Sequence, residues 1–333
     1  MTNMMTIPND RYQQDEVLSA VKTAGSVLLF GHISPDGDTL GSVLALKHRL
    51  ERMGKRVQAM VDGFVPSYLQ FLPGADQLLS AEHVPEAFEL AISVDVSSAD
   101  RLGKCQTIFN NAEKTALVDH HGTNPGFAGI NMIDAEAPAT ALLVYRLFQM
   151  MDMPMTRDEA ICLYAALSTD TGNFIYESTN AECFAMMGAL MEAGLPLSYY
   201  SRLLFRQKEL AHVKLLSEAL PSLHLLADGR IAGLSLTMAQ MEKAGANGGH
   251  AEGIVNYAID LEGVRLAYFA REFEEGKVKF SLRALDPYAV DQAAAALGGG
   301  GHRLAAGVTL QMPLAQAVDT VEQALLNALG GQA

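Results

Sequence analysis

The sequence has few cysteines and few basic residues. Its 333 residues include three cysteines, Cys105, Cys162 and Cys183, which are far apart and lack C-x-x-C spacing. This pattern is typical of buried thiols rather than of zinc ligands or disulfides. Only 24 lysines and arginines stand against 38 acidic residues, a net charge of −14. Because non-specific nucleic-acid binding needs many cations, the acidic composition argues against binding of long DNA or RNA over an extended surface. A short nucleotide could still bind in a local basic pocket.

A long apolar run is also absent. The longest apolar stretch, 137–155, is interrupted by Arg146, Asp152 and Pro154, which argues against a membrane span. The first 16 residues have neither a basic segment nor a continuous apolar segment, so they do not form a signal peptide. We therefore expect a soluble, cytoplasmic protein.

Short apolar runs alternate with helical periodicity in the first half of the chain. The expected strands are 26–32, 56–62, 89–95 and 114–119, and the expected helices lie near 12–23, 40–53, 138–151, 157–168 and 180–193. Such alternation predicts a parallel sheet with helices on both faces. Polar residues that follow these strands would lie at the carboxyl edge, where open α/β sheets bind ligands.

The second half has a different pattern. Residues 197–219 are expected to form one long connecting helix. Hairpins are expected at 222–237, around Asp228-Gly229, and at 264–285, with a turn at 274–276. Helices near 250–260, 289–297 and 314–329 complete a smaller α+β domain. We predict an α/β protein with a catalytic domain at 1–193, a helical linker at 194–220 and a second domain at 221–333.

Acidic residues and histidines follow four of the predicted elements. They are His32, Asp36 and Asp38 in the first group, Asp95 in the second, Asp119-His120-His121 in the third and Asp170 in the fourth. Oxygen and imidazole donors without thiolate suit Mn²⁺ or Mg²⁺. The ligands are too many for one ion, whereas two ions roughly 3.5–4 Å apart could share an aspartate. Each residue alone has an ordinary role as a cap, a turn or a packed histidine, but their convergence favours a metal site.

These motifs resemble those of the DHH phosphoesterase family, named for the triplet that stands here as Asp119-His120-His121. The second half resembles the DHHA1 accessory domain of that family, with four glycines at 298–301 followed by His302 and Gly307. The resemblance implies one Mn²⁺ on His32, Asp36 and Asp95, and a second on Asp38, Asp95, His120 and Asp170, with Mg²⁺ or Co²⁺ as substitutes. It further implies attack by a hydroxide held between the ions, with His121 contacting the phosphate and protonating the leaving oxygen. Asp119 would orient the histidines.

A basic and glycine-rich group in the second half suggests a phosphate clamp. Successive glycines permit close backbone approach and can form an anion-binding nest, although a flexible loop has the same composition. Arginines on adjacent hairpin strands suit phosphate, whereas surface cover of an edge strand explains Arg271 nearly as well. The expected substrate-binding residues are Arg271, Arg283, Gly299, Gly300, Gly301 and His302.

The two-domain architecture resembles the family's nanoRNase-type oligoribonucleases. This implies hydrolysis of short RNA to nucleoside 5′-monophosphates and of 3′-phosphoadenosine 5′-phosphate (pAp) to AMP, without binding of long duplexes; such proteins can be homodimers. Two departures, Ile175 in place of arginine and Ala284 in place of serine, bear on substrate preference. The main alternative is a cyclic-dinucleotide or pApA phosphodiesterase. A RecJ-like exonuclease, a family II pyrophosphatase and a catalytically silent nucleotide-binding regulator fit less well.

Overall fold

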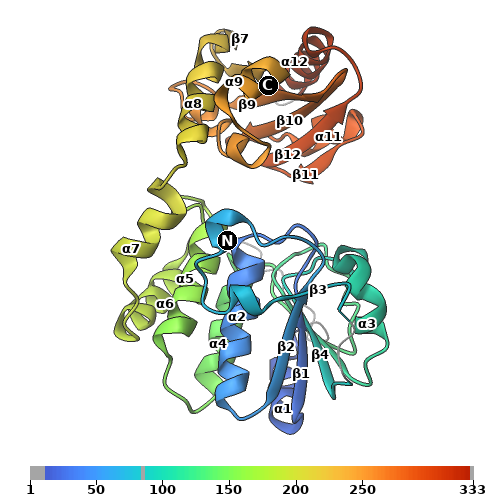
Figure 1. Ribbon diagram of the computed structural model, residues 1–333, viewed down its shortest axis with the longest axis vertical. Helices are drawn as coiled ribbons and strands as arrows, with labels where there is room; N and C mark the ends of the chain where they lie inside the picture. Colours follow the sequence, from blue (N-terminus) through green and yellow to red (C-terminus); the bar gives the residue numbers. More distant parts are fainter. Residues whose placement is uncertain (1–11, 84–86, 331–333) are drawn as a thin grey trace, which may run out of the picture. The chain divides into compact units, whose positions relative to one another are not determined.

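The chain divides into two compact units, Met1–Gln207 and Lys208–Ala333, each built around one six-stranded sheet (Figure 1). The computed structural model describes residues 12–83 and 87–330. Among these residues, no helix is both long enough and apolar enough to cross a membrane. The predicted linker, 194–220, spans the division between the units.

The sheet of the first unit is entirely parallel, with the strand order β3-β2-β1-β4-β5-β6. Its strands are β1 (Ser26–Phe30), β2 (Arg56–Val61), β3 (Leu79–Ser80), β4 (Leu90–Val94), β5 (Thr115–Asp119) and β6 (Ile130–Ile133). The four predicted strands are confirmed to within two residues, and the short strands β3 and β6 were not predicted. The strand order reverses between β1 and β4, and such a point is where ligands bind in open α/β sheets.

Helices cover both faces of this sheet, as predicted. Along β1, Val27 and Leu29 pack into one core cluster, whereas Leu28 and Phe30 pack into another on the opposite face. The first cluster contains the buried faces of α1 (Gln14–Thr23), α2 (Gly37–Arg52), α4 (Thr140–Met150), α5 (Arg157–Asp170) and α6 (Ala181–Glu192). The second contains Phe109 of α3 (Gln106–Asn110), whose ring centroid lies 5.6 Å from that of Phe30.

The expectation of one long helix over 197–219 is wrong. The segment forms α7 (Leu197–Ser201), a π-helical turn at Arg202–Arg206 and, after a break, α8 (Leu210–Ala219). The break at residues 207–209 is a polar Gln-Lys-Glu sequence that offers no apolar face. Leu204 packs in the core of the first unit and Leu215 in a core cluster of the second. Each half of the segment is therefore held by a different core.

The sheet of the second unit has the order β11-β12-β10-β9-β8-β7 and is antiparallel except for the β8–β9 pair. Its strands are β7 (His224–Leu226), β8 (Ile231–Leu236), β9 (Leu266–Glu274), β10 (Lys277–Ala284), β11 (Gly300–His302) and β12 (Ala305–Leu310). Both predicted hairpins are confirmed. The β11–β12 hairpin was not predicted, because the first two residues of β11 lie in the glycine run that suggested a loop.

In the described part of the second unit, α8 is followed by four further α-helices: α9 (Met238–Ala244), α10 (Asn256–Ile259), α11 (Asp291–Ala296) and α12 (Leu314–Gly330). The last two match their predicted ranges, and α9 was not predicted. The helix expected over 250–260 is limited to α10, because Gly253 takes a positive φ of 80° that interrupts it. Tyr268 and Phe280 face α11 and α12, whereas Phe269 faces the side of α8, α9 and α10.

Candidate functional site

The first two carboxylates lie at the N-terminus of a helix. Strand β1 ends at Phe30, and Asp36 is the N-cap of α2, where its Oδ1 accepts a 3.1 Å hydrogen bond from the backbone N–H of Thr39. Asp38 lies in the first turn of the same helix. The free N–H groups and the helix dipole favour negative charge at this end. This explains in part how two carboxylates one residue apart are tolerated after a buried strand.

Asp38 is fully buried and also binds the start of α4. Its Oδ2 accepts a 2.6 Å hydrogen bond from the N–H of Thr140, and its Oδ1 accepts from the N–H of Ala141 at 3.0 Å. The hydroxyl of Ser42 donates to Oδ1 at 2.9 Å. The carboxylate thereby joins the N-termini of α2 and α4. Since its two oxygens offer about four lone pairs, it can still bind a cation.

Asp95 follows β4 and is held at both carboxylate oxygens. The hydroxyl of Thr39 donates to Oδ2 at 2.6 Å and that of Thr140 donates to Oδ1 at 2.9 Å. Asp95 is buried and has a φ of +61°, which is uncommon for residues other than glycine and recurs at functional sites. Sequence reasoning missed both threonines, although each lies in the first turn of a helix that begins at the carboxyl edge of the sheet.

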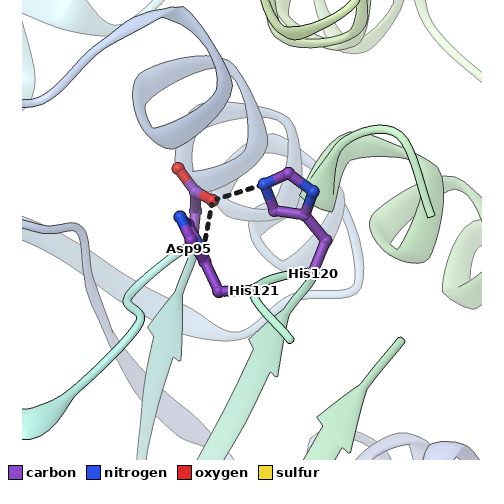
Figure 2. A group of neighbouring side chains, drawn as sticks. All are labelled: Asp95, His120 and His121. Carbon is purple, nitrogen blue, oxygen red and sulfur yellow. Dashed lines mark ion pairs between the residues drawn. The ribbon is translucent and has the colours of Figure 1, made fainter. Parts of the chain in front are cut away.

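The two histidines of the Asp119-His120-His121 triplet converge on Asp95 (Figure 2). Asp119 ends β5, and its Oδ1 lies 2.7 Å from Nδ1 of His121. His120 Nδ1 lies 3.1 Å from the carbonyl oxygen of Ala137, so Nε2 is the nitrogen available to the acidic residues. The distance from Asp95 Oδ1 is 3.7 Å to His120 Nε2 and 3.8 Å to His121 Nδ1.

The structure brings every predicted metal ligand into this one cluster. His32 Nε2 lies 3.6 Å from Asp36 Oδ2 and 3.8 Å from Asp95 Oδ2. Three groups could each hold an ion, with ligand atoms within 4.8 Å of one another. They are His32, Asp36 and Asp95; Asp38, His120 and Asp170; and Asp95, His120 and His121. Asp95 belongs to two of the groups. In the group of Asp95, His120 and His121, the Nδ1 atom of His121 is already engaged by Asp119.

The electrostatics of the cluster also favour cations. Burial raises the pKa of Asp95 to about 6, and repulsion from Asp36 and Asp170 adds to the effect. Burial likewise raises the pKa of Asp38 well above its usual value, with a contribution from Asp95. Burial alone would lower the pKa of His120, but Asp170, Asp38 and Asp95 together raise it to about 11. The protein alone therefore compensates these buried carboxylates poorly, and divalent cations fit the donor set.

One cation of the first unit does lie beside the cluster. The guanidinium nitrogen Nη2 of Arg101 is 3.4 Å from His32 Nδ1 and donates to the carbonyl oxygen of Ile33 at 3.4 Å. The sequence analysis did not single out Arg101. The available signal was its position six residues after Asp95, at the same edge of the sheet. By contrast, Ile175, at the position where arginine was expected from the resemblance, is 80% exposed.

In the second unit, four of the predicted substrate-binding positions, 271, 283, 300 and 302, lie on one face of the sheet. Ser281 of β10 pairs with Phe269 of β9 and with Gly307 of β12, which in turn pairs with Gly300. The neighbouring row on the same face contains Arg283, Ala305 and residue 302. Arg271, Arg283, Ser281 and Phe269 line a cavity of about 310 Å³. The side chain of His302 lies outside the described part of the structure.

The glycine run acts mainly through close backbone approach. A Cβ on Gly299 would lie 2.2 Å from the carbonyl oxygen of Gly307, and one on Gly301 would lie 2.6 Å from that of Ala305. The N–H groups of Gly298 and Gly299 donate to carbonyl oxygens at the end of α11. Those two amides are therefore not free to form the nest expected from the sequence, and the glycines instead allow β11 to pair closely with β12.

Comparison with known proteins identifies the family. Residues 26–167 match the family model described as DHH family, N-terminal domain, and residues 233–329 match the DHHA1 domain. A Thermus thermophilus protein named "Bifunctional oligoribonuclease and PAP phosphatase NrnA" is 31% identical, with 97% of each chain covered. The chain belongs to the DHH family. It is thus a hydrolase of the DHH phosphoesterase type.

Other DHH relatives match over nearly the same length. A Bacillus subtilis protein, also named "Bifunctional oligoribonuclease and PAP phosphatase NrnA", is 23% identical over 89% of this chain and 92% of its own. The crystal structure of an exopolyphosphatase-related protein from Bacteroides fragilis superposes with a TM-score of 0.90 at 27% identity, covering 96% of this chain and 98% of the other. The DHH match includes all predicted metal ligands except Asp170, which lies three residues beyond it.

Proposed function

We propose that this chain is a Mn²⁺-dependent phosphoesterase that hydrolyses short oligoribonucleotides to nucleoside 5′-monophosphates and pAp to AMP. The observation that carries the proposal is the position of Asp95 between donor groups at the carboxyl edge of the sheet. Relatives that are named as oligoribonucleases and PAP phosphatases and that cover nearly the whole chain support the substrate class.

Two divalent cations fit the donor set. His32, Asp36 and Asp95 would hold one, and Asp38, Asp95, His120 and Asp170 would hold the other, with Asp95 shared. When bound, such ions lower the pKa of water and neutralise charge that develops on a phosphate during displacement. Mn²⁺ is the proposed metal, and Mg²⁺ or Co²⁺ would be substitutes with the same preference for oxygen and nitrogen donors.

Thr39 and Thr140 keep the shared carboxylate in position. Each hydroxyl donates to a different oxygen of Asp95, so the carboxylate plane is fixed from both sides. Each oxygen retains a lone pair for a cation. Because Thr140 also binds Asp38 through its backbone, one residue at the start of α4 positions ligands of both proposed ions.

His121 would serve as the proton donor to the leaving oxygen. Asp119 engages Nδ1 at 2.7 Å, which leaves Nε2 directed away from the carboxylate. Burial alone would lower the pKa of His121, but Asp119 and Asp95 together raise it, which favours the protonated ring. An imidazolium in contact with the phosphate stabilises negative charge and can transfer a proton to the departing ribose oxygen.

The second unit would hold the remainder of the substrate. Arg271 and Arg283 line its cavity, and the guanidinium group matches phosphate oxygens in pairs. Gly299, Gly300, Gly301 and His302 form or adjoin the neighbouring edge strand, and a Cβ on Gly300 would meet nothing within 4 Å, so a nucleotide could approach the backbone there. We propose these six residues as the substrate-binding set.

A turnover assay with Mn²⁺ tests the proposal. The substrates are a 24-nucleotide RNA, a diribonucleotide, pAp, pApA, cyclic di-AMP and pyrophosphate. Rapid hydrolysis of the dinucleotide and of pAp, with slow hydrolysis of the 24-mer, is expected. A preference for cyclic di-AMP would instead make the protein a cyclic-dinucleotide phosphodiesterase, and inactivity on all six would contradict an enzymatic role.

Two aspartate variants serve as controls for the assay. Asp95→Asn should abolish turnover because it removes the shared ligand. Asp100→Asn removes one exposed carboxylate from the segment after the same strand and should leave turnover unchanged. Equal activity of both variants would contradict the proposed role of Asp95.

A further inference from the structure

Two cations lie directly opposite each other in the second unit. In the antiparallel β9–β10 ladder, Arg271 pairs with Lys279, and Arg283 follows four residues along β10 on the same face. Like charges at directly opposed positions destabilise a sheet. Neither Arg271 nor Lys279 forms an ion pair with any residue that the structure describes. In a chain that carries only 24 basic residues, this local concentration of positive charge favours binding of an anion.

The same cations border a cavity that is open to a ligand. The cavity of about 310 Å³ is lined by Arg271, Lys279, Ser281 and Arg283, together with a glycine-rich loop that contains Gly248 and Glu252. Glu252 supplies the one carboxylate among these lining residues, against three cations. The lining therefore carries a net positive charge although the whole chain is strongly acidic.

Arg271 is held at this cavity in a partly desolvated state. A Cβ on Gly248 would lie 3.2 Å from its Nη2 and 3.3 Å from its Nη1, so the guanidinium lies close against the backbone of this glycine. Burial lowers the pKa of Arg271, and no acid among the described residues offsets the effect. A desolvated guanidinium without a carboxylate partner gains more from a phosphate than an exposed one does.

The spacing along β10 separates the cations into two positions. Lys279 and Arg283 are four residues apart, which corresponds to roughly 13 Å of extended strand. One position lies around Arg283 and Ser281, next to the glycine strand. The other lies around the Arg271 and Lys279 pair, beside Gly248. Ser281, between them, offers a hydroxyl to either.

We propose that Arg271 and Lys279 form a second phosphate subsite, distinct from the one at Arg283, that binds an additional phosphate of a nucleotide substrate. The proposal rests on the proposed function and specifies it: a third nucleotide in a short RNA supplies one more phosphodiester for this subsite. Oligonucleotides that reach the subsite are therefore preferred over those that do not. Lys279, which the sequence analysis did not single out, is a specificity-determining residue of the second unit.

The test compares kcat/KM for a di-, a tri- and a tetraribonucleotide of the same base. In wild type, kcat/KM for the trinucleotide should exceed kcat/KM for the dinucleotide. Lys279→Gln and Arg271→Gln should each lower this ratio by about 10-fold, and the double variant by up to about 100-fold, as expected for lost charge-assisted hydrogen bonds. The loss should appear in KM rather than in kcat, because the subsite lies away from the reacting atoms.

Lys277→Gln is the matched control. Lys277 lies on the same strand, two residues from Lys279, and its ammonium group is paired with Glu274. Its removal changes the net charge by the same amount and should leave the ratio unchanged. Lys279 is exposed, so the Lys279→Gln variant is expected to fold even if Arg271→Gln does not. An unchanged ratio in folded Lys279→Gln would overturn the subsite.

A binding measurement separates this inference from the proposed function. Fluorescence anisotropy with a labelled trinucleotide, in EDTA and over a range of salt concentrations, requires no turnover. The slope of the logarithm of the association constant against log[salt] is negative, and its magnitude should decrease by about 0.7 for each phosphate contact that a substitution removes. If the variants show a shallower slope than wild type but wild type hydrolyses no RNA, the subsite is retained and the proposed function is rejected. Hydrolysis of dinucleotides with an unchanged slope in both variants would retain the function and reject the subsite.

Discussion

Asp119 Oδ1 lies 2.7 Å from His121 Nδ1, while Asp119 Oδ2 accepts a 2.6 Å hydrogen bond from the side-chain amide of Asn124. Asp119 is fully buried, and Asn124 is fixed in turn by a 2.8 Å hydrogen bond to the carbonyl oxygen of Val96. The carboxylate therefore has one orientation, and it engages Nδ1 of His121, which leaves Nε2 as the nitrogen proposed to face the substrate. The chain of contacts joins the loop after β4 to the loop after β5.

Asp119→Asn should lower kcat by about 10²-fold or more, since the amide no longer selects the productive tautomer of His121. KM should change little, because neither residue is proposed to provide the main substrate contacts. Steady-state kinetics on a dinucleotide checks this. The double variant Asp119→Asn/His121→Ala should be no slower than His121→Ala alone. Additive losses would show that Asp119 acts independently of His121.

Asp95→Asn should make the metal-free protein more stable and the metal-loaded protein less stable than wild type. Removing one buried negative charge relieves repulsion with Asp36 and Asp170, but it also removes the shared ligand. At Mn²⁺ concentrations about 100 times Kd, wild type should gain roughly 2.7 kcal/mol, or about 5–10 °C in the Tm of the first unit. Calorimetry in EDTA and in Mn²⁺ measures the Tm difference between the variant and wild type in each state. An equal gain for the variant would exclude Asp95 as a ligand.

The sequence predicted which acidic residues and histidines lie together at this site, because each belongs to or adjoins an element with a clear pattern. Asp95 follows the buried strand Leu90–Val94, and Asp119 ends the strand Thr115–Asp119. Parallel strands place their carboxyl ends at one edge, so residues far apart in the chain converge without any knowledge of side-chain geometry. Separation in sequence is thus no obstacle to predicting the members of such a site.

The partners that fix those residues could not be predicted in the same way. Thr140 contacts Asp95 across 45 positions of sequence and Asp38 across 102. These contacts depend on the packing of α4 against α2, which periodicity does not specify. Likewise, Lys279 faces Arg271 only because the β9–β10 ladder contains an irregularity between Lys277 and Val278 that sets its register.

A hydrogen-bonded group in the second unit predicts a pH dependence of stability. His224 Nε2 lies 2.6 Å from Glu322 Oε1, which also accepts a 2.5 Å hydrogen bond from Tyr268. Burial alone would lower the pKa of His224, but the hydrogen bond to Glu322 raises it above its ordinary value of 6.5. The folded state therefore keeps a proton that the unfolded state has lost between pH 6.5 and the raised pKa.

Because the native state holds the extra proton in that window, the stability of the second unit should fall as the pH rises from about 6.5 through the raised pKa of His224. Below pH 6.5 both states are protonated and the full contribution is present. Urea midpoints between pH 6 and 9 measure the effect. Glu322→Gln should flatten the profile, whereas Glu218→Gln, which removes a carboxylate paired with Lys243, should not. A flat profile in wild type would contradict the role of His224.

The first unit contains a buried ion pair that supports the helix carrying Asp170. Arg49 donates to both carboxylate oxygens of Glu159, at 2.9 and 3.0 Å, and Arg52 donates to the same carboxylate. Glu159 is fully buried and also caps α5 together with Thr156. Breaking such a pair leaves an uncompensated buried charge, since the guanidinium of Arg49 cannot reach solvent.

Glu159→Ala should therefore destabilise the first unit by about 3–5 kcal/mol, measured as the free energy of unfolding in urea. Replacing both partners, as in Arg49→Met/Glu159→Leu, should recover part of the loss because no charge is left unpaired in the core. Glu82→Ala breaks an exposed pair with Lys104 in the same unit and should leave the midpoint unchanged. If the double variant were as unstable as Glu159→Ala, the cost would come from lost capping of α5 rather than from the buried charge of Arg49.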